Sequence, residues 1–170
     1  MRWSKLAIVD KAQYLVKRYA TANPFRIAAA IGVNIHFCEL GTLKGMYAHI
    51  KRNRFIVINN TLDEHLQKIV CAHELGHDQF HREMLKNKWM HEFILYDMNK
   101  RPEYEANLFA AEILLPDEEI IEMSNDGLDI EQIARAIYSD VNLVALKLTT
   151  LAQKGHQFRQ FDYKSDFLKK

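Results

Sequence analysis

The stretch His73-Glu74-Leu75-Gly76-His77 places two imidazoles four positions apart, with a carboxylate between them. In a helix, side chains four positions apart lie on one face, so both imidazoles can reach a single metal ion. Glu74 then points beside the metal, where it can accept a proton from an attacking water molecule. The stretch therefore predicts a metal-binding helix that also carries a general base.

The residues around this motif predict that it is helical. Thr61-Leu62-Asp63-Glu64 has the pattern of a capping box, and its two acidic residues suit the positive end of a helix dipole. An apolar stripe at helical spacing follows, and it includes both histidines of the motif. We therefore expect the histidines on the face that turns toward the core, sheltered from bulk water. The stripe consists of Leu66, Ile69, Val70, His73 and His77.

A catalytic metal site of this kind needs a third protein ligand. A third histidine from the same segment would require Gly at position 80 and His at position 83, where this chain has Phe80 and Glu83. His81 lies about 12 Å along the helix axis from His73, which is too far to share one ion. We expect His81 to flank the site or to be exposed. The third ligand must come from another element.

Residues 101–116 are predicted to form that element, because Pro102 suits the first turn of a helix and the segment ends at another proline. Glu103 lies on a stripe of small and apolar residues that would let the metal-binding helix approach closely. Glu105 and Glu112 project from the other side, and we interpret them as part of a solvated face. Glu103 is therefore the predicted third ligand, with Glu105 as the runner-up.

Asn107 lies one helical turn after Glu103 on the same predicted face. Its side-chain oxygen could accept a hydrogen bond from the outer nitrogen of a ligating histidine and so hold the tautomer of that ring. We therefore expect one helix to supply both the third ligand and a residue that supports the site.

Together, the motif H-E-L-G-H with a further His four residues on, and the motif E-x-E-A-N-x-F-A-A-E-I-L-L-P at residues 103–116, closely resemble the ImmA/IrrE family of zinc-dependent metallopeptidases. The resemblance runs from about Asn23 to Pro116 and more loosely beyond. It implies a gluzincin-like endopeptidase with a single zinc ion, and it supports Glu103 as a ligand. Family members of phage or mobile-element type act as anti-repressors that cut a helix-turn-helix repressor encoded nearby, which implies such a protein as the substrate.

The residues before the metal-binding helix predict a small antiparallel sheet. Residues 33–38 alternate between two faces with a period of two. Residues 46–50 and 55–58 flank a polar turn, as the two strands of a hairpin do. With the helices, these strands predict an α+β, zincin-like fold. An edge strand of the sheet could pair with an extended substrate, although the sequence does not indicate which edge.

The segment between His81 and Arg101 is rich in charged and aromatic residues and could form a lid over the substrate cleft. His91 or Tyr96 could stabilise the oxyanion of the tetrahedral intermediate. The alternative is that these aromatic residues only anchor a connecting segment, and we prefer this interpretation for each of them.

Residues 117–170 are predicted to be a helical region packed on a metallopeptidase core formed by residues 1–116. Its helices resemble a helix-turn-helix, which could bind nucleic acid through residues 128–154. A helix that reads DNA is expected to carry several basic residues, whereas residues 142–151 contain one, Lys147. We therefore prefer helical packing, or docking of a protein partner, over DNA binding.

The composition of the 170-residue chain is that of an ordinary globular protein, with 48% hydrophobic and 26% charged residues. A net charge of +1 gives no general attraction to nucleic acid or membranes. The first ten residues contain no apolar stretch long enough for a signal peptide, and two cysteines provide no disulfide framework. We therefore expect a cytoplasmic protein without a membrane partner.

Two hypotheses for the function follow. In the first, His73, His77 and Glu103 hold Zn²⁺, and Glu74 is the general base in the hydrolysis of a peptide bond in a helix-turn-helix repressor. In the second, the chain is a non-catalytic regulator that binds DNA or sequesters a repressor. The intact set of site residues favours the first hypothesis, because sequestration does not need Glu74 beside two histidines.

Overall fold

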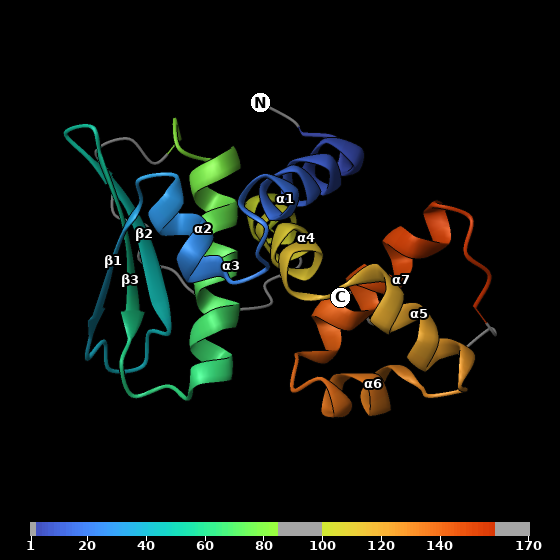
Figure 1. Ribbon diagram of the computed structural model, residues 1–170. Coiled ribbons are helices and arrows are strands. Elements are labelled where there is room, and N and C mark those ends of the chain that lie inside the picture. Colours follow the sequence, from blue (N-terminus) through green and yellow to red (C-terminus); the bar gives the residue numbers. More distant parts are fainter. Residues whose placement is uncertain (1–2, 85–99, 159–170) are drawn as a thin grey trace.

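The computed structural model describes residues 3–84 and 100–158, which form seven helices and one three-stranded sheet (Figure 1). The sheet and α2 pack on one side of α3, and α4 packs on the other side with α1 against it. Within the described ranges, none of the helices combines the length and the apolar character needed to cross a membrane. The elements are α1 (Lys5–Tyr19), α2 (Pro24–Ala30), β1 (Asn34–Cys38), β2 (Gly45–Ile50), β3 (Asn53–Asn59), α3 (Glu64–Phe80), α4 (Arg101–Leu114), α5 (Asp117–Asn125), α6 (Ile130–Ala136) and α7 (Val141–Gln153).

The sheet is mixed, and its strand order is β1-β3-β2. β2 and β3 form the predicted antiparallel hairpin, which turns at Lys51 and Arg52, both with positive φ. β1 pairs with β3 in the parallel direction, from Asn34 beside Phe55 onward. The α+β, zincin-like class is confirmed, but the expectation of a purely antiparallel sheet is corrected. The chain reverses twice between β1 and β3, so these strands run the same way, and β3 inserts between β1 and β2.

The helix α3 is present, but it begins two residues later than the predicted capping box at Thr61 implies. Asp63 is the N-cap, and its side chain accepts a hydrogen bond from the backbone N–H of Leu66 at 2.8 Å. Thr61 instead donates its hydroxyl to the side-chain oxygen of Asn59. Because α3 lies between the sheet and α4, the whole motif from His73 to His77 is buried.

α3 and α4 are in close contact where Gly76 faces Ala106. A Cβ atom at position 76 would lie 2.9 Å from the Cα of Ala106 and 3.1 Å from its carbonyl oxygen. Close-packed side chains do not approach backbone atoms at such distances, so glycine is required here. The small residues that the sequence placed on this face of α4 therefore do bring Glu103 toward the two histidines.

α7 packs against α4 through a buried ion pair. The ammonium of Lys147 on α7 is 2.9 Å from a carboxylate oxygen of Glu112 on α4, and it also pairs with Asp117. Thr150 donates a hydrogen bond to the other oxygen of Glu112 at 2.6 Å. The interpretation of Glu112 as solvated was wrong, because α7 covers that side of α4. Lys147, the one basic residue of α7, points into the protein, with 1% of its surface exposed, which agrees with the preference for helical packing over DNA binding.

Candidate metal centre

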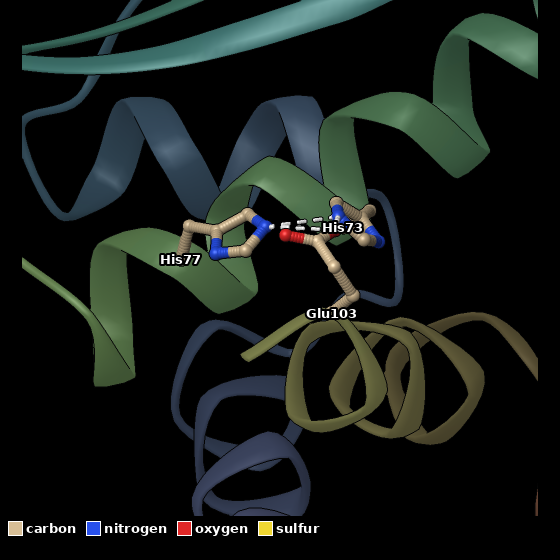
Figure 2. Close-up of side chains that lie close together, drawn as sticks. All are labelled: His73, His77 and Glu103. Carbon is tan, nitrogen blue, oxygen red and sulfur yellow. Dashed lines mark hydrogen bonds and ion pairs between the residues drawn. The ribbon is translucent and has the colours of Figure 1, made fainter. Parts of the chain in front are cut away.

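His73, His77 and Glu103 come together between α3 and α4 (Figure 2). The Nε2 atoms of the two histidines are 2.9 Å apart. Oε2 of Glu103 lies 3.2 Å from Nε2 of His73 and 3.6 Å from Nε2 of His77. Both histidines are fully buried, and Glu103 is 4% exposed. The structure therefore brings together the three residues that the sequence predicts as ligands.

The three separations fit one tetrahedral metal ion. Nitrogen and oxygen ligands about 2.1 Å from a zinc ion lie about 3.4 Å from one another in tetrahedral geometry. The observed distances of 2.9, 3.2 and 3.6 Å bracket this value. Within the described part of the chain, Oε2 of Glu103 is buried without a hydrogen bond of normal geometry. Two imidazoles and one carboxylate are a known ligand set of catalytic zinc sites, so these residues fit zinc.

Asn107 orients the ring of His73. Its side-chain oxygen lies 2.7 Å from Nδ1 of His73. An amide oxygen can only accept a hydrogen bond, so His73 carries its proton on Nδ1 and has a lone pair on Nε2. That lone pair faces His77 and Glu103. The contact is the one that the helical spacing predicts for Asn107.

Glu74 is 1% exposed, and its Oε1 atom has no hydrogen-bond partner among the residues that the structure describes. Burial, and then the charge of Glu103, raise the pKa of Glu74 well above its ordinary value. Gly45 of β2 approaches this carboxyl group closely. A Cβ atom at position 45 would lie 3.5 Å from Oε1 of Glu74 and would overlap Val70 at 2.4 Å. The sheet therefore passes Glu74 at a position where only glycine fits.

The surroundings set the ionisation of two members of the cluster. Burial lowers the pKa of His77 to about 4, although the contact with Glu103 acts in the opposite direction. Burial would raise the pKa of Glu103, but the contacts with His73 and His77 outweigh it and lower that pKa to about 2. At neutral pH, Glu103 is therefore ionised and His77 is neutral, which are the forms that bind a metal ion.

His81 occupies one of the two positions expected for it, beside the site, whereas Glu105 occupies a position that the sequence did not predict. Both are 3% exposed. Nδ1 of His81 lies 3.0 Å from Nδ1 of His77, and Nε2 of His81 lies 3.1 Å from Oε2 of Glu105. Glu105, the runner-up ligand, contacts His81 and lies outside the metal cluster. Its interpretation as a solvated residue was wrong, because the last turn of α3 covers it. His81 flanks the site and is buried.

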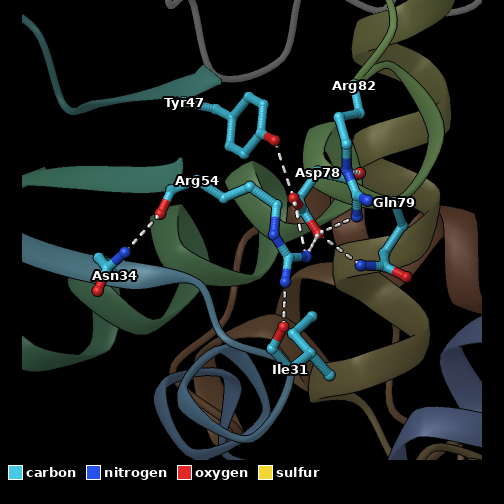
Figure 3. A network of polar contacts seen from close by, with 7 residues as sticks. All are labelled: Ile31, Asn34, Tyr47, Arg54, Asp78, Gln79 and Arg82. Carbon is cyan, nitrogen blue, oxygen red and sulfur yellow. Dashed lines mark hydrogen bonds and ion pairs between the residues drawn. The ribbon is translucent and has the colours of Figure 1, made fainter. Parts of the chain in front are cut away.

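A second polar network fastens the end of α3 to the sheet (Figure 3). Asp78, which directly follows the motif, is fully buried. Its carboxylate accepts hydrogen bonds from Tyr47 at 2.8 Å, from Arg54 at 3.0 Å and from Arg82 at 3.0 Å. Arg54 also donates to the carbonyl of Ile31, directly after α2. Sequence reasoning missed this network, although an acidic residue inside a buried helix was a signal that it needed partners.

His91 and Tyr96 lie outside the described residues, as does most of the segment that the sequence suggests as a lid. Their role in stabilising an oxyanion, and the alternative role as anchors, remain predictions from the sequence.

Comparisons with known proteins match the part of the chain that contains this site. Residues 28–149 match the family model Peptidase_M78, described as the IrrE N-terminal-like domain. The uncharacterized immunity region protein 2 of Bacillus phage phi105 is 39% identical over 123 residues, which cover 72% of this chain and 77% of that protein. Metallopeptidase ImmA of Bacillus subtilis (strain 168) is 30% identical over 135 residues, which cover 78% of each chain.

Proposed function

The chain belongs to the ImmA/IrrE family of metallopeptidases, and on that premise we propose that it is a zinc endopeptidase that cuts a specific protein, a helix-turn-helix transcriptional repressor of a phage or mobile element. It would thus be an anti-repressor that acts in the cytoplasm, where repressors bind DNA. The observation that carries the proposal is the convergence of His73, His77 and Glu103 next to the buried Glu74.

In this proposal His73, His77 and Glu103 hold the zinc ion. Zinc, when bound, supplies a Lewis acid that acidifies a water molecule and polarises the peptide carbonyl. Glu74 accepts a proton from the attacking water as the water oxygen bonds to the carbonyl carbon. The same carboxyl group then donates that proton to the leaving amine as the C–N bond breaks. One water molecule is consumed, and Glu74 returns to its starting state.

The β2 edge of the sheet is the better binding place for an extended substrate. β1 and β2 are the two edge strands, and β2 is the one that packs against α3. Gly45 of β2 approaches Glu74, whereas β1 lies two strands away from that position. A substrate that pairs with β2 by main-chain hydrogen bonds would place a peptide bond near Glu74. We therefore assign the substrate to β2.

The relatives support a repressor as the substrate. One is named as an immunity region protein of a phage, and another is named as Metallopeptidase ImmA. DNA binding by the chain itself is not part of the proposal, because the burial of Lys147 leaves α7, the helix that would have to read DNA, without an exposed basic residue. The competing hypothesis is that the chain sequesters a repressor without cleaving it.

Co-expression with a helix-turn-helix repressor encoded nearby tests the proposal. Wild type should convert the repressor into two fragments, and mass spectrometry of the new N-terminus gives the scissile bond. Glu74→Gln should bind zinc as wild type does and cleave about 10²–10⁴-fold more slowly, because the general base is lost. Glu64→Gln, an exposed change on the first turn of α3, is the matched control and should cleave normally.

The outcomes separate the two hypotheses. Cleavage that survives Glu74→Gln would reject the mechanism. Inhibition of the repressor by wild type and Glu74→Gln alike, at one chain per repressor and without fragments, would support sequestration instead.

A further inference from the structure

A continuous chain of polar contacts leads from His77 away from the metal cluster. Nδ1 of His77 lies 3.0 Å from Nδ1 of His81, and Nε2 of His81 lies 3.1 Å from Oε2 of Glu105. The other oxygen of Glu105 accepts a hydrogen bond from Arg101 at 2.6 Å. Arg101 in turn donates to the backbone carbonyl of Trp3 at 2.9 Å. This series of contacts therefore runs from a predicted metal ligand, through the ion pair of Glu105 and Arg101, to the backbone of Trp3.

This chain of contacts has one arrangement of protons that keeps all rings neutral. The ionised Glu105 can only accept a hydrogen bond, so the proton of His81 must lie on Nε2. Nδ1 of His81 is then an acceptor, and the proton between the two rings must belong to Nδ1 of His77. His77 is left with a lone pair on Nε2, which faces His73 and Glu103. If the proton of His77 were instead on Nε2, it would point at the other two ligands and exclude a cation.

We propose that His81 and Glu105 are positioning residues that hold His77 in the Nδ1–H tautomer and so prepare its Nε2 atom for the metal. This inference rests on the proposed metal site. Asn107 does the same for His73 with a neutral amide, through a contact of 2.7 Å. α4 therefore supplies the third ligand, Glu103, and one residue behind the tautomer of each histidine ligand, Asn107 for His73 and Glu105, through His81, for His77.

Arg101 and Trp3 hold Glu105 in place for this role. Arg101 lies one turn earlier on α4 and is tied to Trp3, whose indole N–H donates to the carbonyl of Phe80 at 3.0 Å. Phe80 directly precedes His81, so the contacts close a ring around the end of α3. Because the residues around Glu105 are fixed from both sides, its carboxylate keeps its direction toward His81 before any metal binds.

The ring-nitrogen spectrum of the metal-free protein tests the tautomers directly. Two-bond ¹⁵N–¹H correlation spectra should show His77 protonated on Nδ1 and His81 protonated on Nε2. A spectrum with the proton of His77 on Nε2, or with His81 doubly protonated near neutral pH and donating to His77, would overturn the proposal. This readout does not depend on zinc. Wild type that fails to bind zinc but shows these tautomers would reject the metal site and leave the positioning intact.

The proposal implies that loss of the His77 tautomer weakens zinc binding. Zinc affinity, measured by chelator competition, tests this. His81→Phe keeps a ring of similar size but removes the acceptor for His77, and it should weaken zinc binding about 10–100-fold. Glu105→Gln should also weaken it and should show a mixture of His77 tautomers, because an amide can either donate to or accept from His81. Wild-type affinity and an unmixed tautomer in Glu105→Gln would overturn the proposal even if His81→Phe failed to fold.

His65→Phe is the matched control, because His65 is an exposed histidine on the same helix. Its ring stacks on Tyr138, a contact that phenylalanine can retain. We expect wild-type zinc affinity and wild-type tautomers at His77. An equal loss of affinity in His65→Phe and His81→Phe would show a general effect on α3 and would contradict a specific role for His81.

Discussion

The two ends of α4 each carry a buried glutamate, and the two glutamates have different partners. Glu112 meets an ammonium, Lys147, and a hydroxyl, Thr150, so its charge is matched within the protein. Glu103 instead faces the ring nitrogens of His73 and His77. A buried carboxylate is costly unless a cation or hydrogen-bond donors compensate it. The comparison indicates that the Glu112 cluster stabilises the fold, whereas the Glu103 cluster is built for a cation from outside.

The largest expected effect is on zinc content. Glu103→Ala should reduce bound zinc from about one ion per chain to almost none, because three protein ligands are needed for this type of site. Glu112→Ala should keep the zinc, although it leaves Lys147 with less compensation. Elemental mass spectrometry of the purified proteins, after removal of loosely bound metal, measures both. Equal zinc content in the two variants would contradict the distinction between the glutamates. Glu105→Ala, a change next to the ligand set, should retain a zinc ion at saturating metal.

Lys147→Met should lower the unfolding free energy by about 3–5 kcal/mol. The substitution leaves Glu112 buried without its ammonium partner. Urea unfolding of the metal-free protein measures this. Lys154→Met, which removes a partly exposed partner of Asp117, should cost less than about 1 kcal/mol and serves as the control. A small effect of Lys147→Met would show that this ion pair does not hold α7 to α4.

Gly76→Ala should lower the unfolding free energy by about 1–3 kcal/mol and weaken zinc binding, because the new methyl group would collide with the backbone of Ala106. In a helix without such a contact, glycine to alanine is stabilising by about 1 kcal/mol, so the sign of the effect is informative. Urea unfolding and chelator competition give the two values. A stabilised variant with normal zinc affinity would show that the close approach of α3 and α4 does not position the ligands.

The smallest expected effect concerns pH. Burial opposes ionisation of Asp117, but Lys147 and Lys154 outweigh it and hold its pKa below the ordinary value of 3.8. A carboxyl group with a lowered pKa in the folded state stabilises the fold above about pH 3.8, and that contribution is lost as the pH falls. Asp117→Asn should therefore lose less stability than wild type between pH 5 and pH 3, by urea unfolding of metal-free protein. An equal loss of unfolding free energy in wild type and Asp117→Asn between pH 5 and pH 3 would contradict this prediction.

Local spacing was enough to predict much of the site. The i, i+4 pair His73 and His77, the face shared by Glu103 and Asn107, and the start of α3 near residue 63 all depend on helical periodicity within one segment. The pairing of β2 with β3 was also predictable, because a short polar turn joins them. Each of these features is decided by residues close together in the chain.

Helical periodicity therefore predicted the helices and the faces on which His73, His77, Glu103 and Asn107 lie. Which of these faces are covered depends on how the helices pack in the folded protein. A helical wheel shows that Glu105 and Glu112 point away from Glu103, but it cannot show that α3 covers one and α7 the other. The parallel pairing of β1 and the burial of Asp78 and Lys147 were hidden for the same reason. Partners from distant segments, such as Tyr47 and Arg54 for Asp78 and Glu112 for Lys147, make this burial possible, and neighbours in sequence alone do not reveal them.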